Sequence, residues 1–241
     1  MAMKLPAFSP MSTPDLLEGG SRTVAAAAAH QVRGPLSSVR LRLDLLLDRL
    51  LDPAHTAARH EVRGILDEVA RLSQVLEQVL AWGTVDQDAE APVETVDALG
   101  VAAARVDAWY ALASTRRVRL CLDGVAVTGI HIRGCLEQAL DVFLDNALHV
   151  TPEGGDVSVT VHAAPDQVRV EVCDQGPGMS EEEIAHACIP FWRGEAGRGR
   201  QGTGLGLTIA SALLAASGGR LGLERVPDGG LRAVALLPRA D

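Results

Sequence analysis

Apolar residues in the first third of the chain follow a heptad pattern. They recur at alternating spacings of four and three through Val32, Leu36, Val39, Leu43, Leu46 and Leu50. Asp52-Pro53 interrupts the pattern, which resumes through Val62, Ile65, Val69, Leu72, Leu76 and Val79 and ends at Trp82-Gly83. Proline suits the first turn of a new helix. The pattern therefore predicts two long helices that form an antiparallel hairpin.

A helical hairpin buries only the face that its two helices share. Leu41, Leu45 and Leu47 lie beside the heptad positions and stay uncovered in one hairpin. Two hairpins that pair as a four-helix bundle bury this surface, so we expect a homodimer. The pattern alone is also compatible with a coiled-coil stalk that carries no chemistry.

The rest of the chain alternates between helical and strand-like patterns. Helices are predicted at about 95–115, 132–149 and 203–217, with a short helix from Ser180, where Ser180 and Glu183 have capping-box spacing. Strands are predicted at 118–122, 125–130, 156–162, 168–173, 220–226 and 231–237. This order predicts an α/β sandwich with a mixed sheet and helices on one face, and so an α+β chain overall.

Polar stretches divide the chain into parts. Residues 1–20 have the composition of a tail or linker, and residues 84–93 are polar and acidic without a period. We therefore expect a hairpin domain at 21–84 and a sandwich domain at 94–241.

Charge and apolar run lengths restrict the partners. The formal net charge is −9 and the pI about 5.2, which argues against bulk binding to nucleic acid or to an anionic membrane surface. No apolar run reaches the roughly 18 residues of a membrane-spanning helix, and prolines at 6, 10 and 14 break any signal-peptide core. We expect a cytoplasmic chain, or the intracellular part of a membrane-anchored receptor. The four cysteines form no CxxC pair and are expected to be buried free thiols.

Lysine is nearly absent from the chain. Lys4 is the single lysine. P-loop nucleotidases require a lysine at the phosphates, and serine, threonine and tyrosine kinases require one on a strand. Both classes are excluded.

The segment HQVRGPL at 30–36 lies one turn into the heptad pattern. Extending the pattern back places a core position at Ala29, so His30 flanks the core and is partly exposed. Pro35 bends the helix just after it, and alanines at 25–29 leave the imidazole open to a partner.

Three further segments have features of a nucleotide site. In DQGPGM at 174–179, an Asp at a strand end can accept a hydrogen bond from an exocyclic amine, while Gly-x-Gly lets the backbone approach a flat ligand. GTGLGL at 202–207 opens a helix and offers backbone N–H groups to an anion, although its spacing is not the dinucleotide fingerprint. Asn146 carries a neutral oxygen suited to Mg²⁺. Each of these segments alone gives only weak support for a nucleotide site.

In this order the segments resemble the motifs of sensor histidine kinases of bacterial two-component systems. HQVRGPL resembles the phosphoacceptor box, LDNALHVTPEGG the asparagine box, DQGPGM the first glycine box, PFWRG the phenylalanine box and GTGLGL the second glycine box. The resemblance covers about residues 22–238. It implies a dimeric histidine phosphotransfer bundle followed by the ATP-binding sandwich shared with gyrase, a heat-shock chaperone and a mismatch-repair protein.

The resemblance also implies roles for single residues. His30 is the expected phosphoacceptor, and Asn146 is expected to hold Mg²⁺. Asp174 is expected to bind the adenine amino group, in a pocket shaped by Gly176 and Gly178. The phosphates are expected at the second glycine box, beneath a lid at 193–202 that begins with Arg193. The residues of this box expected to bind them are Gly202, Thr203, Gly204, Leu205 and Gly206. The implied activity is autophosphorylation by MgATP, followed by phosphoryl transfer to an aspartate of a response regulator.

The sequence departs from the family pattern at four places. Gln31 replaces an acidic residue, Gly34 a Thr or Asn tied to phosphatase activity, Val142 a second asparagine, and His149-Val150 the usual Lys-Tyr. Gln31 is expected to act beside His30, and His149 to make a weaker or pH-dependent phosphate contact. These departures support an alternative, a nucleotide-binding dimeric scaffold or pseudokinase. An ATPase or serine kinase of the same fold is disfavoured, because Val142 stands where those ATPases have a glutamate base.

Overall fold

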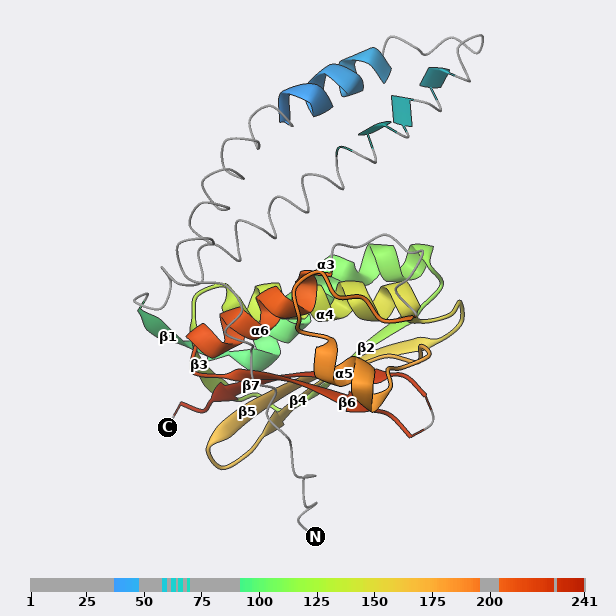
Figure 1. Ribbon diagram of the computed structural model, residues 1–241. Coiled ribbons are helices and arrows are strands. Elements are labelled where there is room, and N and C mark those ends of the chain that lie inside the picture. Colours follow the sequence, from blue (N-terminus) through green and yellow to red (C-terminus); the bar gives the residue numbers. More distant parts are fainter. Residues whose placement is uncertain are drawn as a thin grey trace. The chain divides into compact units, whose positions relative to one another are not determined.

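The computed structural model describes residues 37–47, 92–195, 204–227 and 229–240, and single positions between them at 58, 59, 62, 63, 65, 66 and 69. The chain divides into two compact units, each with its own internal contacts (Figure 1). One unit spans residues 15–86, and the other contains residues 87–241.

The first unit is helical wherever it is described. Residues 37–47 form one helical segment, and the described positions between 58 and 69 are helical as well. Val62 and Val69, both heptad positions, are buried. The exposed large apolar residues of this unit are Val39, Leu41, Leu45, Leu46 and Ile65. In one copy, therefore, an apolar surface that includes Leu41 and Leu45 stays uncovered, as the sequence predicts.

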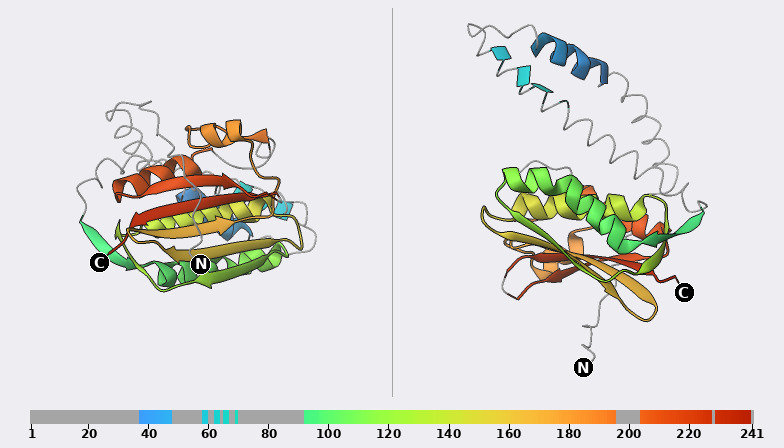
Figure 2. Two further views of the ribbon diagram at one scale, coloured as in Figure 1. Left: turned by 90° about the horizontal axis from the view of Figure 1, so that it is seen from below. Right: turned by 180° about the vertical axis from the view of Figure 1, so that it is seen from behind.

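The second unit is a five-stranded mixed sheet covered by helices on one face (Figures 1 and 2). The strands, in spatial order, are β2 (Arg119–Gly124), β4 (Asp156–Ala163), β5 (Gln167–Cys173), β7 (Leu231–Pro238) and β6 (Arg220–Arg225). β2 and β4 are parallel, and the other neighbours are antiparallel. The covering helices are α3 (Ala98–Thr115), α4 (Cys135–Val150) and α6 (Gly206–Ala216). The predicted α/β sandwich is confirmed.

The core lies between the sheet and these helices. β5 alternates, with Val168, Val170 and Val172 directed into the core. From α4, the largest fully buried side chains are those of Leu136, Leu140, Phe143, Leu144 and Leu148. Their spacing of three and four leaves a different face of α4, through Val142, Asn146 and Val150, outside the fully buried set.

A second, two-stranded sheet contradicts the sequence prediction. β1 (Val93–Asp97) pairs antiparallel with β3 (Thr128–Ile132), whereas a helix was expected from about residue 95. The helix begins at Ala98 instead. Val93, Thr95 and Val96 favour a strand, but the partner that stabilises it lies more than thirty residues further along the chain. β3 likewise lies two to three residues later than expected.

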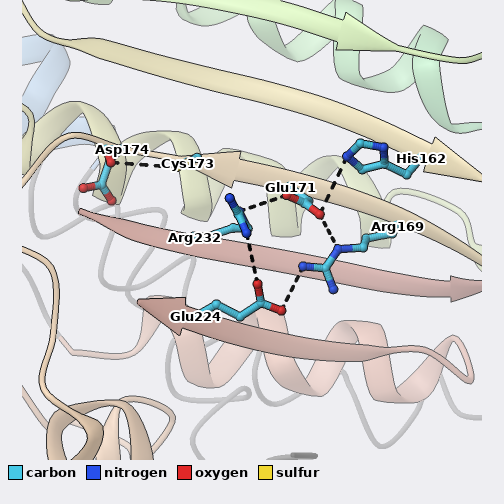
Figure 3. A network of polar contacts seen from close by, with 7 residues as sticks. All are labelled: His162, Arg169, Glu171, Cys173, Asp174, Glu224 and Arg232. Atoms are coloured by element: carbon cyan, nitrogen blue, oxygen red, sulfur yellow. Dashed lines mark hydrogen bonds and ion pairs between the residues drawn. The ribbon is translucent and has the colours of Figure 1, made fainter. Parts of the chain in front are cut away.

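The outer face of the sheet carries a closed ring of four charged side chains (Figure 3). Arg169 pairs with Glu171 and lies 2.8 Å from Glu224, while Arg232 lies 3.0 Å from Glu171 and 3.3 Å from Glu224. The ring joins β5, β7 and β6. Val234 of β7 lies opposite Glu171 on one side and Gly222 on the other, and it is 0% exposed.

The cysteines are free, as expected, but they are not all buried. Cys135 and Cys188 are buried, and burial raises the pKa of Cys188 to about 11. Cys121, in contrast, is exposed, because β2 is an edge strand and Cys121 belongs to its more exposed side. Within the described residues, no helix is long and apolar enough to cross a membrane.

Candidate active site

Asp174 follows the last residue of β5 and is 6% exposed. Its Oδ1 accepts hydrogen bonds from the backbone N–H of Gly176 at 2.7 Å and of Leu231 at 3.3 Å. Burial raises the pKa of Asp174, and these two hydrogen bonds oppose that rise. Among the described residues none donates to its Oδ2. This oxygen is suited to accept a hydrogen bond from the amino group of a ligand.

The glycines after Asp174 are required by close packing. A Cβ on Gly176 would lie 2.7 Å from Cγ2 of Val150, the last residue of α4. Gly178 has a φ of +71°, and a Cβ there would lie 2.7 Å from the carbonyl oxygen of Gly230. Gly230 is a site residue that the sequence analysis missed. Its only signal is the Gly229-Gly230 pair, and nothing local places that pair against Asp174.

The second glycine box lies beside the phenylalanine box. The carbonyl oxygen of Gly204 accepts a hydrogen bond from the N–H of Phe191 at 3.0 Å. Gly204 has a φ of +72°, and a Cβ there would lie 2.7 Å from Trp192 O. Leu205 is buried and anchors the start of α6. Arg193, half-buried, directly follows Trp192.

The N-terminus of α6 can accept an anion. The helix begins at Gly206, and the side chain of its N-cap residue, Leu205, makes no capping hydrogen bond. The backbone N–H groups of this turn, together with the positive end of the helix dipole, favour negative charge. A Cβ on Gly206 would lie 3.2 Å from Cγ1 of Val142, so the start of α6 lies against α4.

These contacts arrange the site along one face of α4. Val142, Asn146 and Val150 follow one another at a spacing of four, which places them in a row on the helix surface. Val142 lies beside Gly206, and Val150 lies beside Gly176. Asn146, between them, is exposed. The structure therefore brings together the turn that follows Asp174, the side chain of Asn146 and the start of α6.

His149 lies in a different set of contacts. Its Nδ1 is 2.7 Å from the carbonyl oxygen of Asp145 and 3.1 Å from the Asp145 carboxylate, and its Nε2 is 3.1 Å from Nη2 of Arg116. The hydrogen bond to Asp145 raises the pKa of His149, against opposing effects of burial and of the Arg116 charge. Arg116 is the second residue near the site that the sequence analysis missed.

The other predicted residues lie outside the described part of the chain. These are His30, Gln31, Gly202 and Thr203. Their roles stay predictions.

Asn146 fits a magnesium ion that is held mainly by phosphate and water. Mg²⁺ is usually bound through one or two protein oxygens together with substrate phosphates. The exposed amide of Asn146 makes no side-chain hydrogen bond to the described residues, so its oxygen is available. In the described part of the chain, no group of three or more His, Cys, Asp or Glu residues could hold a metal ion.

Two protein-family models match the chain. The first, described as histidine kinase-, DNA gyrase B- and HSP90-like ATPase, matches residues 133–241. The second, described as the His Kinase A phospho-acceptor domain, matches residues 21–88, which include His30 and Gln31.

The chain is also similar to curated sensor kinases. The sensor protein kinase PmrB of Pseudomonas aeruginosa is 30% identical over 225 residues, which cover 90% of this chain and 46% of PmrB. A probable sensor histidine kinase HK of Mycobacterium tuberculosis is 33% identical over 73% of this chain and 46% of that protein. The chain therefore spans less than half the length of these relatives.

Solved structures of histidine kinases are similar to the chain as well. Full-length ShkA in complex with AMPPNP superposes with a TM-score of 0.74 at 27% identity, covering 90% of this chain and 45% of ShkA. The mycobacterial sensor histidine kinase MprB superposes with a TM-score of 0.52 at 25% identity, covering 61% of this chain and 98% of that structure. With both domains matched in this order, the chain belongs to the sensor histidine kinases of bacterial two-component systems.

Proposed function

We propose that the chain binds MgATP in the site along α4, phosphorylates its own His30, and passes the phosphoryl group to an aspartate of a response regulator. The observation that supports this most is the placement of Asn146 between Gly176 and Gly206. The adenine pocket, a metal-binding oxygen and an anion-accepting helix start then follow one another along a single helix face, in the order in which a nucleotide presents its base and its phosphates.

Each described residue has a defined task in this proposal. Oδ2 of Asp174 accepts the adenine amino group, and Gly176 and Gly178 keep the turn close to the base. Gly204, Leu205 and Gly206 form the start of α6 that receives the phosphates. Asn146 holds Mg²⁺ through its side-chain oxygen, and the ion, when bound, offsets charge on the phosphate oxygens.

The chemical step moves one phosphoryl group. The unprotonated ring nitrogen of His30 attacks the γ-phosphorus, the bond from phosphorus to the β–γ bridging oxygen breaks, and ADP leaves. Gln31 accepts a hydrogen bond from the other ring nitrogen and fixes the tautomer. An amide cannot take that proton, so it passes to water. General-base assistance, worth about 10²–10⁴ in rate, is lost, and we expect slow autophosphorylation.

Labelling by γ-labelled ATP separates this proposal from its alternatives. A histidine kinase acquires protein-bound label that acid removes. A serine kinase acquires acid-stable label, an ATPase releases phosphate without labelling the chain, and a scaffold does neither. Asn146→Ala should abolish labelling with Mg²⁺ while adenosine binding persists. Acid-stable label, or no label on the full chain, would overturn the proposal.

A further inference from the structure

Arg116 reaches from the end of α3 onto the last turn of α4. Its Nη1 donates to the carbonyl oxygen of Leu148 at 3.0 Å, and its Nη2 lies 3.1 Å from Nε2 of His149. A guanidinium can only donate, so Nε2 of His149 is the acceptor in this contact. The ring proton then sits on Nδ1, which donates to the carbonyl oxygen of Asp145 at 2.7 Å. With Nε2 as the acceptor, the His149 ring holds the Arg116 guanidinium in place.

The surroundings of Arg116 are negative. The C-terminal end of a helix carries the negative end of its dipole, and Leu148 lies in the last turn of α4. The Asp145 carboxylate is in the same turn and directly precedes Asn146. A nucleotide with its base at Gly176 and its phosphates at Gly206 would bring phosphate charge to Asn146, one turn before the end of the helix. The carboxylate and the helix terminus would repel the phosphates, and a positive charge in addition to Mg²⁺ would reduce this repulsion.

Arg116 lies close enough to change this balance. Asn146 and His149 are three residues apart and hence neighbours on the helix surface. The guanidinium in contact with His149 is therefore on the order of one Debye length, about 8 Å at physiological salt, from a phosphate at Asn146. Arginine also keeps its charge throughout the physiological pH range.

We propose that Arg116 supplies the positive charge that raises the affinity of the Asn146 end of the site for the phosphate chain, with His149 holding its guanidinium in place. This inference rests on the proposed nucleotide site and identifies a cation for it. It also changes the expectation for His149, which was a weaker or pH-dependent phosphate contact. His149 becomes a positioning residue for a permanent charge.

A series of ligands with different numbers of phosphates tests the inference. The dissociation constants of ATP, ADP and adenosine are measured by calorimetric titration of the full chain with Mg²⁺ present, for the unchanged protein and for Arg116→Gln. Loss of one nearby charge should weaken ATP about three- to tenfold, ADP less and adenosine not at all. The ATP effect should shrink at high salt, and Arg116→Lys should restore most of the affinity.

Arg117→Gln is the matched control. It removes the same charge from the next residue, whose side chain is exposed and pairs with Glu153. It should leave all three affinities unchanged. Equal weakening of ATP and adenosine in Arg116→Gln would show a structural role only and overturn the inference. An ATP loss of the same size in Arg117→Gln, or no loss in Arg116→Gln, would overturn it as well. If the unchanged protein binds adenosine and ATP equally or neither of them, the proposed function fails instead.

Discussion

At the scale of single residues, Asp174 illustrates how one side chain serves both the fold and a ligand. Its two oxygens have different tasks, because Oδ1 is held by two backbone N–H groups while Oδ2 has no donor in the described structure. The DQGPGM motif identified Asp174 from the sequence alone. The split between its oxygens was not predictable, because it depends on Leu231, which is far away in the sequence.

Asp174→Asn should separate these tasks. The amide oxygen can still accept from Gly176 and Leu231, and removing a buried charge relieves its desolvation, so unfolding stability should be kept. The amide nitrogen would face the adenine amino group as a second donor, and ATP affinity should fall at least about tenfold. Titration with ATP and thermal melting measure the two effects. Asp166→Asn, at an exposed loop position, is the control, and unchanged ATP affinity in Asp174→Asn would contradict the adenine role.

His131 on β3 should make stability depend on pH. It is 1% exposed, its Nδ1 has no hydrogen-bond partner in the described structure, and its Nε2 is 4.0 Å from Glu94. Burial lowers the pKa of His131, against opposing effects of Glu137 and Glu94. The folded state thus prefers the neutral ring. The contribution of His131 to the free energy of unfolding is therefore complete above its unfolded pKa of about 6.5. It is lost as the pH falls through the lowered pKa of the folded state.

His131→Gln should therefore flatten the pH dependence. Urea unfolding midpoints of the full chain, measured between about pH 7.5 and pH 5, should fall less steeply in this variant than in the unchanged protein. His186→Gln removes an exposed imidazole on the short helix α5 (Glu181–His186) and should keep the original slope. Identical slopes in His131→Gln and the unchanged protein would show that His131 titrates alike in both states.

At the scale of elements, those specified by local sequence signals were predicted well, whereas a strand that depends on pairing with a distant segment was not. The capping box at Ser180 is formed as expected, with Ser180 Oγ accepting from the N–H of Glu183 and the Glu183 carboxylate accepting from the N–H of Ser180. Both interactions span three residues and are visible in the sequence. β1 was missed because its five residues form a strand only by pairing with β3, and α4 was found because its apolar period is long and regular.

The charged ring on the outer sheet face belongs to the same scale, because it links β5, β7 and β6. Arg169→Met leaves Glu171 and Glu224 with Arg232 as their shared cation, and it should lower the free energy of unfolding by about 2–3 kcal/mol. A further Glu224→Gln change should restore part of this loss by removing a charge without enough partners. Chemical denaturation measures both variants. Arg225→Met, at an exposed position of β6, should cost little, and an equal cost at both arginines would contradict a role for the ring.

At the scale of the whole molecule, assembly follows from the uncovered apolar surface of the first unit. Leu41 and Leu45 are 60% and 51% exposed, which is a large apolar exposure for neighbouring positions on one helix. Light scattering at micromolar concentration should give twice the 25.3 kDa chain mass. Leu41→Glu combined with Leu45→Glu should shift the mass to that of one chain, whereas Val125→Glu, exposed in the second unit, should not. A monomeric unchanged protein would contradict the four-helix bundle.

Some residues of the candidate site are predictable from sequence motifs, and others are not. The motifs point to Asp174, Asn146 and Gly206, and the structure packs Gly176 and Gly206 against the α4 face that carries Asn146. Arg116 and Gly230 carried no motif and became visible only through contacts with His149 and Asp174. His30 and Gln31 rest on the sequence and on the phospho-acceptor domain match.

The position of the phosphoryl group tests the account most directly. Full-length chains of the unchanged protein, His30→Gln and the control His60→Gln are incubated with γ-labelled ATP and Mg²⁺, and acid-labile label is counted after denaturation. The account predicts label on the unchanged protein and on His60→Gln, and none on His30→Gln, while all three variants bind ATP equally. Acid-labile label that persists in His30→Gln, or its absence from the unchanged protein, would contradict the account.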